Sequence, residues 1–170
     1  MVSKKVENAL NAQVAKEAMS SQVYLAMASW AEVQGLEGVA AFLYRHSDEE
    51  RAHMLKLMRY INERGGHSEV PALAKPPKMM KGIAEVFTGI LKQEVEVSNE
   101  INAIVDLCLK EKDYTTHNFM QWYVAEQIEE ERMARHVLDK LKMIGDDKAG
   151  LYLFDRDLQS GGPGGGGTPS

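Results

Sequence analysis

The chain has 170 residues, of which 44% are hydrophobic, and its formal net charge is −5 at pH 7. This length and apolar content are sufficient for one compact domain with a substantial core. The basic residues are dispersed along an acidic chain, which argues against nucleic acid as a partner. The single cysteine, Cys108, excludes an internal disulfide and any cluster that needs several thiolates, and we expect it to be packed and inert.

Membrane-spanning and secretory segments are not expected in this chain. No apolar run approaches the length that a membrane span requires. The first ten residues, MVSKKVENAL, lack the apolar core of a signal peptide. We therefore expect a soluble, cytoplasmic protein without a membrane partner.

In chain order, four long segments have apolar residues at helical three- and four-residue spacing, and none alternates as a strand would. We predict helices over about residues 3–34, 38–64, 83–110 and 113–144. Glycines at positions 35, 65 and 145 supply the stops after the first, second and fourth helices. Asp113 is a suitable N-cap for the fourth helix.

A Pro/Gly-rich connection, residues 65–82, separates the second and third predicted helices. Extended at roughly 3.3 Å per residue, it reaches about 55 Å. A helix of about 28 residues is shorter than that, because it rises only about 1.5 Å per residue. The connection can therefore cross the whole bundle and make these two helices parallel, while short turns make the first and last pairs antiparallel. We predict an all-α four-helix bundle with one long crossover.

The end of the chain contains a fifth amphipathic segment. Leu151, Phe154 and Leu158 predict a short helix, whose apolar face we expect to pack against other subunits. The domain is thus predicted over residues 1–160. Residues 161–170, GGPGGGGTPS, are expected to be a flexible Gly-rich tail introduced by cloning, and we assign them no role in fold or function.

Each long helix carries at least one acidic residue on its apolar face. On the second helix the apolar rhythm passes through positions 39, 43, 46, 50, 53, 57 and 60, which places Glu50 and His53 toward the core. Counted from the short turns at about 1.5 Å per residue, the inward polar residues all fall near the middle of the bundle. On the other three helices these residues are Glu17, Glu94, Glu126 and Glu130.

This layer of carboxylates predicts a dinuclear metal site. One inward glutamate alone would have two simpler explanations. It could pair with a nearby lysine, or the apolar face of its helix could be misread by one residue position. A layer drawn from four helices is different, since an ionised carboxylate in an apolar interior is costly unless compensated, and no Lys or Arg shares the layer. Two divalent cations would balance four carboxylates. Oxygen donors with one imidazole, at the Glu50-x-x-His53 spacing, suit Fe, Mn or Zn better than Cu(I).

The spacing of these residues resembles the ferritin family, of the non-haem bacterial type, over about residues 3–160. The resemblance rests on Glu17 with Tyr24, EERAH at 49–53, Glu94, and EQIEEE at 126–131. Ferritin-like carboxylate bundles can carry a Glu-x-x-His motif on each of two helices. Here the fourth helix has no second such motif, and Arg51 and Ala52 offer no haem-ligating methionine, which disfavours bacterioferritin. Rubrerythrin is disfavoured because its iron–thiolate domain needs four cysteines.

The resemblance implies a ferritin-like bundle that stores iron without haem. It implies that Fe(II) and O2 are the substrates, that the chain is a ferroxidase, and that 24 copies form a hollow shell around ferric mineral. One iron would be held by Glu17, Glu50 and His53. Glu50 would bridge to a second iron, held with Glu94 and Glu130, with Gln127 close by. A third iron site is implied at Glu49, Glu126, Glu129 and Glu130.

The resemblance also implies roles for two aromatic residues and a pore. Tyr24 and Trp122 could supply electrons during oxygen reduction, although Tyr24 could equally be an ordinary core residue. The segment 116–120 would line a three-fold pore, with His117 and Met120 at the positions where animal ferritins have acidic residues. A pore without carboxylates would attract Fe(II) weakly, so we expect iron to use another opening. The other histidines, His46, His67 and His136, are expected to be solvated or on the surface.

Two other functions are compatible with such a bundle. A soluble di-iron oxidase or oxygenase acting on an organic substrate would need a substrate pocket at the metal. A purely structural bundle would leave the carboxylate layer unexplained. A shell would elute from a sizing column near half a megadalton, far earlier than an oxygenase.

Overall fold

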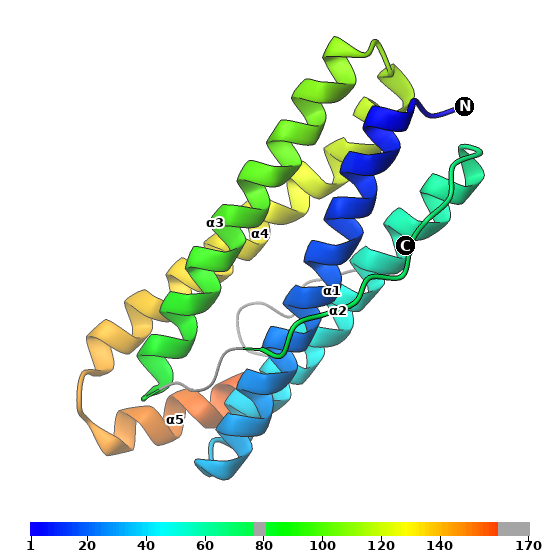
Figure 1. Cartoon of the computed structure of the whole chain (residues 1–170). Coiled ribbons are helices and arrows are strands. Elements are labelled where there is room, and N and C mark those ends of the chain that lie inside the picture. The colour runs from blue at the N-terminus through cyan, green and yellow to red at the C-terminus, as the bar shows by residue number, and fades with distance from the viewer. Residues whose placement is uncertain (77–80, 160–170) are drawn as a thin grey trace.

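The computed structural model describes residues 1–76 and 81–159, and within them all regular secondary structure is helical, with no strand. The helices are α1 (Lys4–Val33), α2 (Glu37–Glu63), α3 (Ile83–Lys110), α4 (Tyr114–Ile144) and α5 (Lys148–Gln159). Figure 1 shows antiparallel α1–α2 and α3–α4 pairs, with α5 lying across one end of the bundle. The predicted bundle with its long crossover and short fifth helix is confirmed. The predicted tail, residues 161–170, lies outside the described residues.

The helix ends follow from local chemistry. The Ser3 side chain accepts a hydrogen bond from the Val6 N–H at 3.4 Å, and Asp113 accepts one from the Thr116 N–H at 3.0 Å. Both satisfy backbone donors that an N-terminal turn leaves free. Gly35 has φ +73°, in the left-handed region that glycine tolerates, so the chain can reverse between α1 and α2. Lys112 makes the corresponding reversal between α3 and α4 with φ 57°.

The apolar core is divided into two clusters along the bundle axis. One cluster contains Tyr24, Phe42 and Phe87, and the other contains Leu10, Leu57 and Ile101. Between the two clusters, every long helix carries buried polar residues. They include Glu17, Ser20 and Ser21 on α1, His46, Ser47, Glu50 and His53 on α2, Glu94 on α3, and Gln127 and Glu130 on α4.

The fifth helix packs on its own bundle. Phe154 and Leu158 are buried in the cluster around Phe42, so the expectation that this apolar face would be covered only by other subunits is wrong for them. Gly38 permits the contact, because a Cβ there would lie 1.7 Å from the Asp155 carbonyl oxygen. The Asp155 side chain accepts a hydrogen bond from the Val39 N–H at 2.8 Å, in the first turn of α2.

Two further expectations concern properties of the whole chain. None of the helices in residues 1–76 and 81–159 is both long and apolar enough to cross a bilayer. Cys108 is free and fully buried. Burial raises the pKa of its thiol to about 11, which fits the packed, inert thiol that the sequence predicts.

Candidate metal centre

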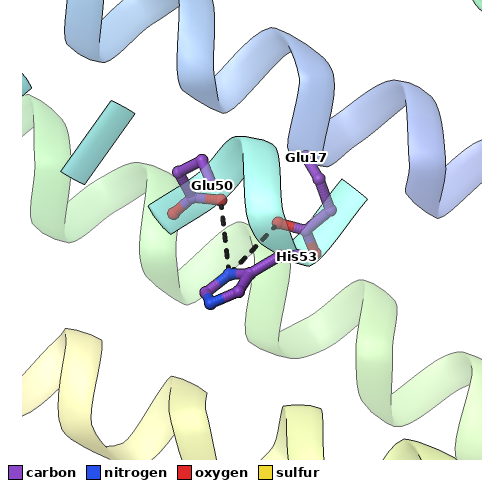
Figure 2. A group of neighbouring side chains, drawn as sticks. All are labelled: Glu17, Glu50 and His53. Carbon is purple, nitrogen blue, oxygen red and sulfur yellow. Dashed lines mark ion pairs between the residues drawn. The ribbon is translucent and has the colours of Figure 1, made fainter. Parts of the chain in front are cut away.

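Three side chains from α1 and α2 converge in the middle of the bundle. Figure 2 shows the carboxylates of Glu17 and Glu50 directed at the same nitrogen of the His53 ring. His53 Nδ1 lies 3.9 Å from a Glu17 oxygen and 3.8 Å from a Glu50 oxygen. These separations exceed a normal hydrogen bond. Two atoms that each bind one ion at about 2.1 Å can be up to about 4.2 Å apart, so the three groups have the spacing of ligands around a cation.

The α1–α2 group is held in place by the helices themselves. Glu50 and His53 are three residues apart on α2, which directs both side chains from one helix face. Gln13, one turn before Glu17 on α1, donates from Nε2 to the Glu17 carboxylate at 2.7 Å. This hydrogen bond occupies one Glu17 oxygen and leaves the other to face His53.

The α3–α4 half of the centre is organised around Glu94. The Tyr24 hydroxyl donates to one Glu94 oxygen at 3.0 Å. Gln127 Nε2 lies 3.1 Å from both the other carboxylate oxygen and the Glu94 main-chain carbonyl, and can donate to either. Glu130, one turn beyond Gln127, has a buried oxygen, Oε2, with no hydrogen-bond partner among the residues that the structure describes. The buried centre thus contains one carboxylate that is fully oriented and one that is unsatisfied.

Burial and mutual repulsion govern protonation of the four carboxyl groups. Burial is the largest cause that raises the pKa of Glu17, Glu50 and Glu94, with neighbouring carboxylates adding to it. The same causes raise the pKa of Glu130 to about 9. Within residues 1–76 and 81–159, the only ion-pair partners of these groups are histidines, with no Lys or Arg. Without a cation the centre therefore retains protons, which a bound metal ion would displace.

His46 is buried, with an exposure of only 6%, so the prediction of a solvated or surface histidine at this position is wrong. Its ring packs on Phe42 with the centroids 4.0 Å apart, and Nδ1 lies 3.0 Å from the Phe42 carbonyl oxygen. Nε2 faces Glu49 and Glu130, at 3.7 Å and 4.0 Å. Position 46 lies on the core-facing rhythm of this helix, so the signal was present in the sequence.

The residues proposed for a third iron are brought together only in part. Glu49 and Glu130 approach the same imidazole. Glu126 is half-buried, and its charge contributes to the raised pKa of Glu130. Glu129 is exposed and forms an ion pair with Arg132, so in this conformation it does not join the cluster.

The two aromatic residues suggested as electron donors lie beside the ligands. Tyr24 is fully buried and hydrogen-bonded to Glu94, and burial raises its pKa. Trp122 contacts the His53 ring edge-on, with the centroids 5.2 Å apart. Lys56 Nζ lies 3.5 Å from the Trp122 ring centroid. Electrons from either ring would have a short path to the metal ligands.

The suggested pore residues differ from one another in exposure. His117 is half-buried in the first turn of α4. Met120 is completely buried in the core cluster with Tyr123, so its placement in a pore wall is wrong. The two residues are one helical turn apart, and of the two only His117 is partly exposed.

Two grooves on the described part of the chain bear on the oxygenase alternative. One, of about 280 Å³, lies between α1 and α3 and is lined by residues such as Lys16 and Gln93. The other, of about 320 Å³, lies between α4 and α5 and is lined by residues such as Met143 and Leu153. Neither groove is lined by a residue of the carboxylate centre, so neither supports an organic substrate at the metal.

Known proteins resemble this chain in both sequence and fold. The family model described as a ferritin-like domain matches residues 7–144. A bacterial non-heme ferritin of Campylobacter jejuni is 41% identical over 160 residues, covering 94% of this chain and 96% of that protein. A bacterial non-heme ferritin of Staphylococcus aureus is 37% identical over 158 residues, covering 93% and 95%. A crystal structure of an open pore ferritin from Archaeoglobus fulgidus matches with a TM-score of 0.92 and 37% identity, covering 94% of this chain and 98% of that one.

Proposed function

The chain belongs to the ferritin family, whose function is iron storage, and we propose that it oxidises Fe(II) with O2 at the buried carboxylate centre. One Fe(II) would bind Glu17, Glu50 and His53. The second would bind Glu94 and Glu130 and share Glu50 with the first. The ferric product would then leave for a storage cavity inside an oligomeric shell.

One observation carries this proposal. Four buried carboxylates and one imidazole, drawn from all four long helices, interrupt a core that is apolar on both sides of them. The described residues supply no Lys or Arg to neutralise these carboxylates. Ionising these groups without a cation is costly, so the empty bundle retains protons. Two divalent cations would replace the protons and balance the charge of the four carboxylates.

The ligand environment suits the redox change. Each Fe(II) gives up one electron, so a pair can deliver two electrons to one O2 molecule. Carboxylate oxygens are hard donors, and they stabilise the Fe(III) product more than sulfur donors would. Gln127 and Tyr24 hold Glu94 by hydrogen bonds, so this ligand needs little reorganisation when iron binds. Tyr24 or Trp122 could supply a further electron to oxygen.

The remaining acidic residues and the assembly complete the proposal. Glu49, Glu126 and Glu129 lie nearer the surface than Glu130 and would receive iron or pass it on.

A shell of 24 copies of this 19.0 kDa chain would have a mass of about 0.46 MDa. Sizing of the intact protein therefore tests the assembly, because a monomer or dimer would elute far later.

Substitution of Glu94 tests the ferroxidase centre. Glu94→Ala removes a ligand of the second iron, so oxidation of the first two Fe(II) per subunit should slow by at least tenfold, by analogy with lost metal-site partners. Glu96→Ala is the matched control, because Glu96 is exposed on the same helix and pairs with Lys16 at 3.7 Å. Stopped-flow absorbance of ferric products measures the rate. Equal rates for the parent and Glu94→Ala would disprove this site.

A further inference from the structure

Gln13 is a buried polar residue of α1 to which the proposed function gives no role. Its side chain is only 2% exposed, and its neighbours Leu10 and Val14 belong to the apolar cluster around Leu57. An amide in such surroundings is costly unless it forms hydrogen bonds. Among the described residues, the side-chain hydrogen bond of Gln13 is the one from Nε2 to Glu17 at 2.7 Å. The contact with this carboxylate therefore explains why an amide is buried here.

The contact with Gln13 distinguishes the two oxygens of Glu17. Oε1 accepts the hydrogen bond, whereas Oε2 is the oxygen that lies 3.9 Å from His53 Nδ1. Figure 2 shows this oxygen directed at the same ring nitrogen as an oxygen of Glu50. The last torsion of a glutamate side chain has a broad distribution, so the helix alone does not determine how its carboxylate is turned. The Gln13 amide supplies that restraint.

The same contact bears on how many Glu17 oxygens bind an ion. A carboxylate can bind a cation through one oxygen or through both. If both oxygens of Glu17 bound the ion, Oε1 would be shared between the ion and the Gln13 amide. Binding through Oε2 alone keeps Oε1 for the hydrogen bond and leaves one more coordination position open on the ion. Reactive metal sites in proteins retain open positions of this kind.

The α3–α4 half of the centre has a comparable arrangement. Glu94 accepts hydrogen bonds from the Tyr24 hydroxyl at 3.0 Å and from Gln127 Nε2 at 3.1 Å. Gln13 restrains the glutamate of α1 as these two residues restrain the glutamate of α3. Loss of a hydrogen-bonded partner of a metal ligand typically weakens metal binding by about 10- to 100-fold.

We propose that Gln13 is a positioning residue for the first iron, which directs Glu17 Oε2 toward the ion held with Glu50 and His53 and keeps Oε1 from binding it. This inference rests on the proposed function, because the ion concerned is one of the two in the dinuclear centre. Gln13 acts through Glu17 and is not itself a ligand.

Metal titration of the intact, metal-free protein tests the proposal, with Zn(II) reporting affinity and Co(II), in the absence of O2, reporting coordination. Gln13→Leu removes the amide and keeps a buried apolar side chain. One zinc ion per subunit should bind about 10- to 100-fold more weakly in calorimetry. The visible absorption of Co(II) at one ion per subunit should also weaken, because a second Glu17 oxygen raises the coordination number. A residue that only packs would change Tm without changing this spectrum.

Two further variants support the comparison. Gln22→Leu is the matched control, because Gln22 is an exposed glutamine on the same helix and should leave the zinc affinity and the cobalt spectrum unchanged. Gln13→Asn keeps an amide that is one methylene too short to reach Glu17, so it should behave as Gln13→Leu does. It also tests the proposal if the leucine variant fails to fold. An unchanged cobalt spectrum in a folded Gln13 variant would overturn the proposal.

Zinc-loaded crystals show the coordination directly. In the parent, Glu17 should bind zinc through Oε2 alone, about 2.1 Å away, while Oε1 still accepts from Gln13. Zinc bound through both Glu17 oxygens in the parent, or through Oε2 alone in Gln13→Leu, would overturn the proposal and leave the dinuclear centre intact. Absence of zinc from Glu17, Glu50 and His53 in the parent would reject the proposed function together with this inference.

Discussion

Replacing Glu130 with glutamine should stabilise the metal-free protein at neutral pH and weaken its response to metal. The pKa of Glu130 is raised to about 9 by burial and by the neighbouring carboxylates, from an ordinary value near 4.5. Between these values the folded chain retains a proton that the unfolded chain has lost. Stability therefore falls as pH rises through this window, and levels off above the folded pKa.

The size of this effect follows from the shift. One group contributes about 1.4 kcal/mol per pH unit inside the window, so the parent should lose about 3 kcal/mol of unfolding free energy between pH 5.5 and 7.5 through Glu130. The Glu130 side chain is only 11% exposed, so solvent screening reduces this figure little. Glu130→Gln removes this titrating group. The difference in unfolding free energy between the variant and the parent should therefore grow by about 3 kcal/mol from pH 5.5 to pH 7.5. For a chain of this size, about 3 kcal/mol corresponds to about 6–12 °C in Tm.

Thermal unfolding of the metal-free protein at several pH values measures the effect. Glu63→Gln is the matched control, because Glu63 is an exposed glutamate at the end of α2 and should leave the pH dependence unchanged. Excess Zn(II) should reverse the order, since the parent gains binding energy that the variant cannot. Equal pH dependence in the parent and Glu130→Gln would refute the argument that an uncompensated carboxyl group lies at this position.

Three further substitutions test other parts of the structure. Gly38→Ala should destabilise the docking of α5 by about 1–3 kcal/mol, because its Cβ would overlap the Asp155 carbonyl. Gly82→Ala is the control, because a Cβ there meets no atom of the described residues within 4 Å, and equal Tm values for the two variants would contradict this packing. Glu129→Ala should leave oxidation of the first two Fe(II) unchanged and slow later turnovers; a slower first turnover would place Glu129 in the centre itself. His117→Trp should leave iron uptake largely intact if iron uses another opening, and abolished uptake would show that this region is the main path.

The helices could be predicted from the sequence because their signals are local. Apolar residues at three- and four-residue spacing defined the buried faces, and Gly35, Gly65 and Gly145 defined the ends. The carboxylate layer was predictable for the same reason, since Glu50 and Glu94 stand on otherwise apolar faces.

The features that were missed depend on contacts between helices or on a choice between neighbouring faces. The helical rhythm already placed position 46 toward the core, but a histidine also suits the surface, and its contact with Glu130 on α4 could not be read from the sequence. Met120 was placed in a pore by counting along the chain, which does not determine its helix face. The docking of α5 depends on the fit between Gly38 and the Asp155 backbone, and the spacing of apolar residues in the sequence does not reveal such a contact.

Mössbauer and electron paramagnetic resonance spectra of the protein loaded with two ⁵⁷Fe(II) per subunit and then oxidised with O2 test the central claim most directly. Two ferric ions that share Glu50 in one centre should be magnetically coupled. The account predicts that most of the iron is an antiferromagnetically coupled pair without a paramagnetic resonance signal at low temperature. Iron that is mostly isolated high-spin Fe(III), with a strong resonance signal, would contradict a dinuclear centre within the subunit.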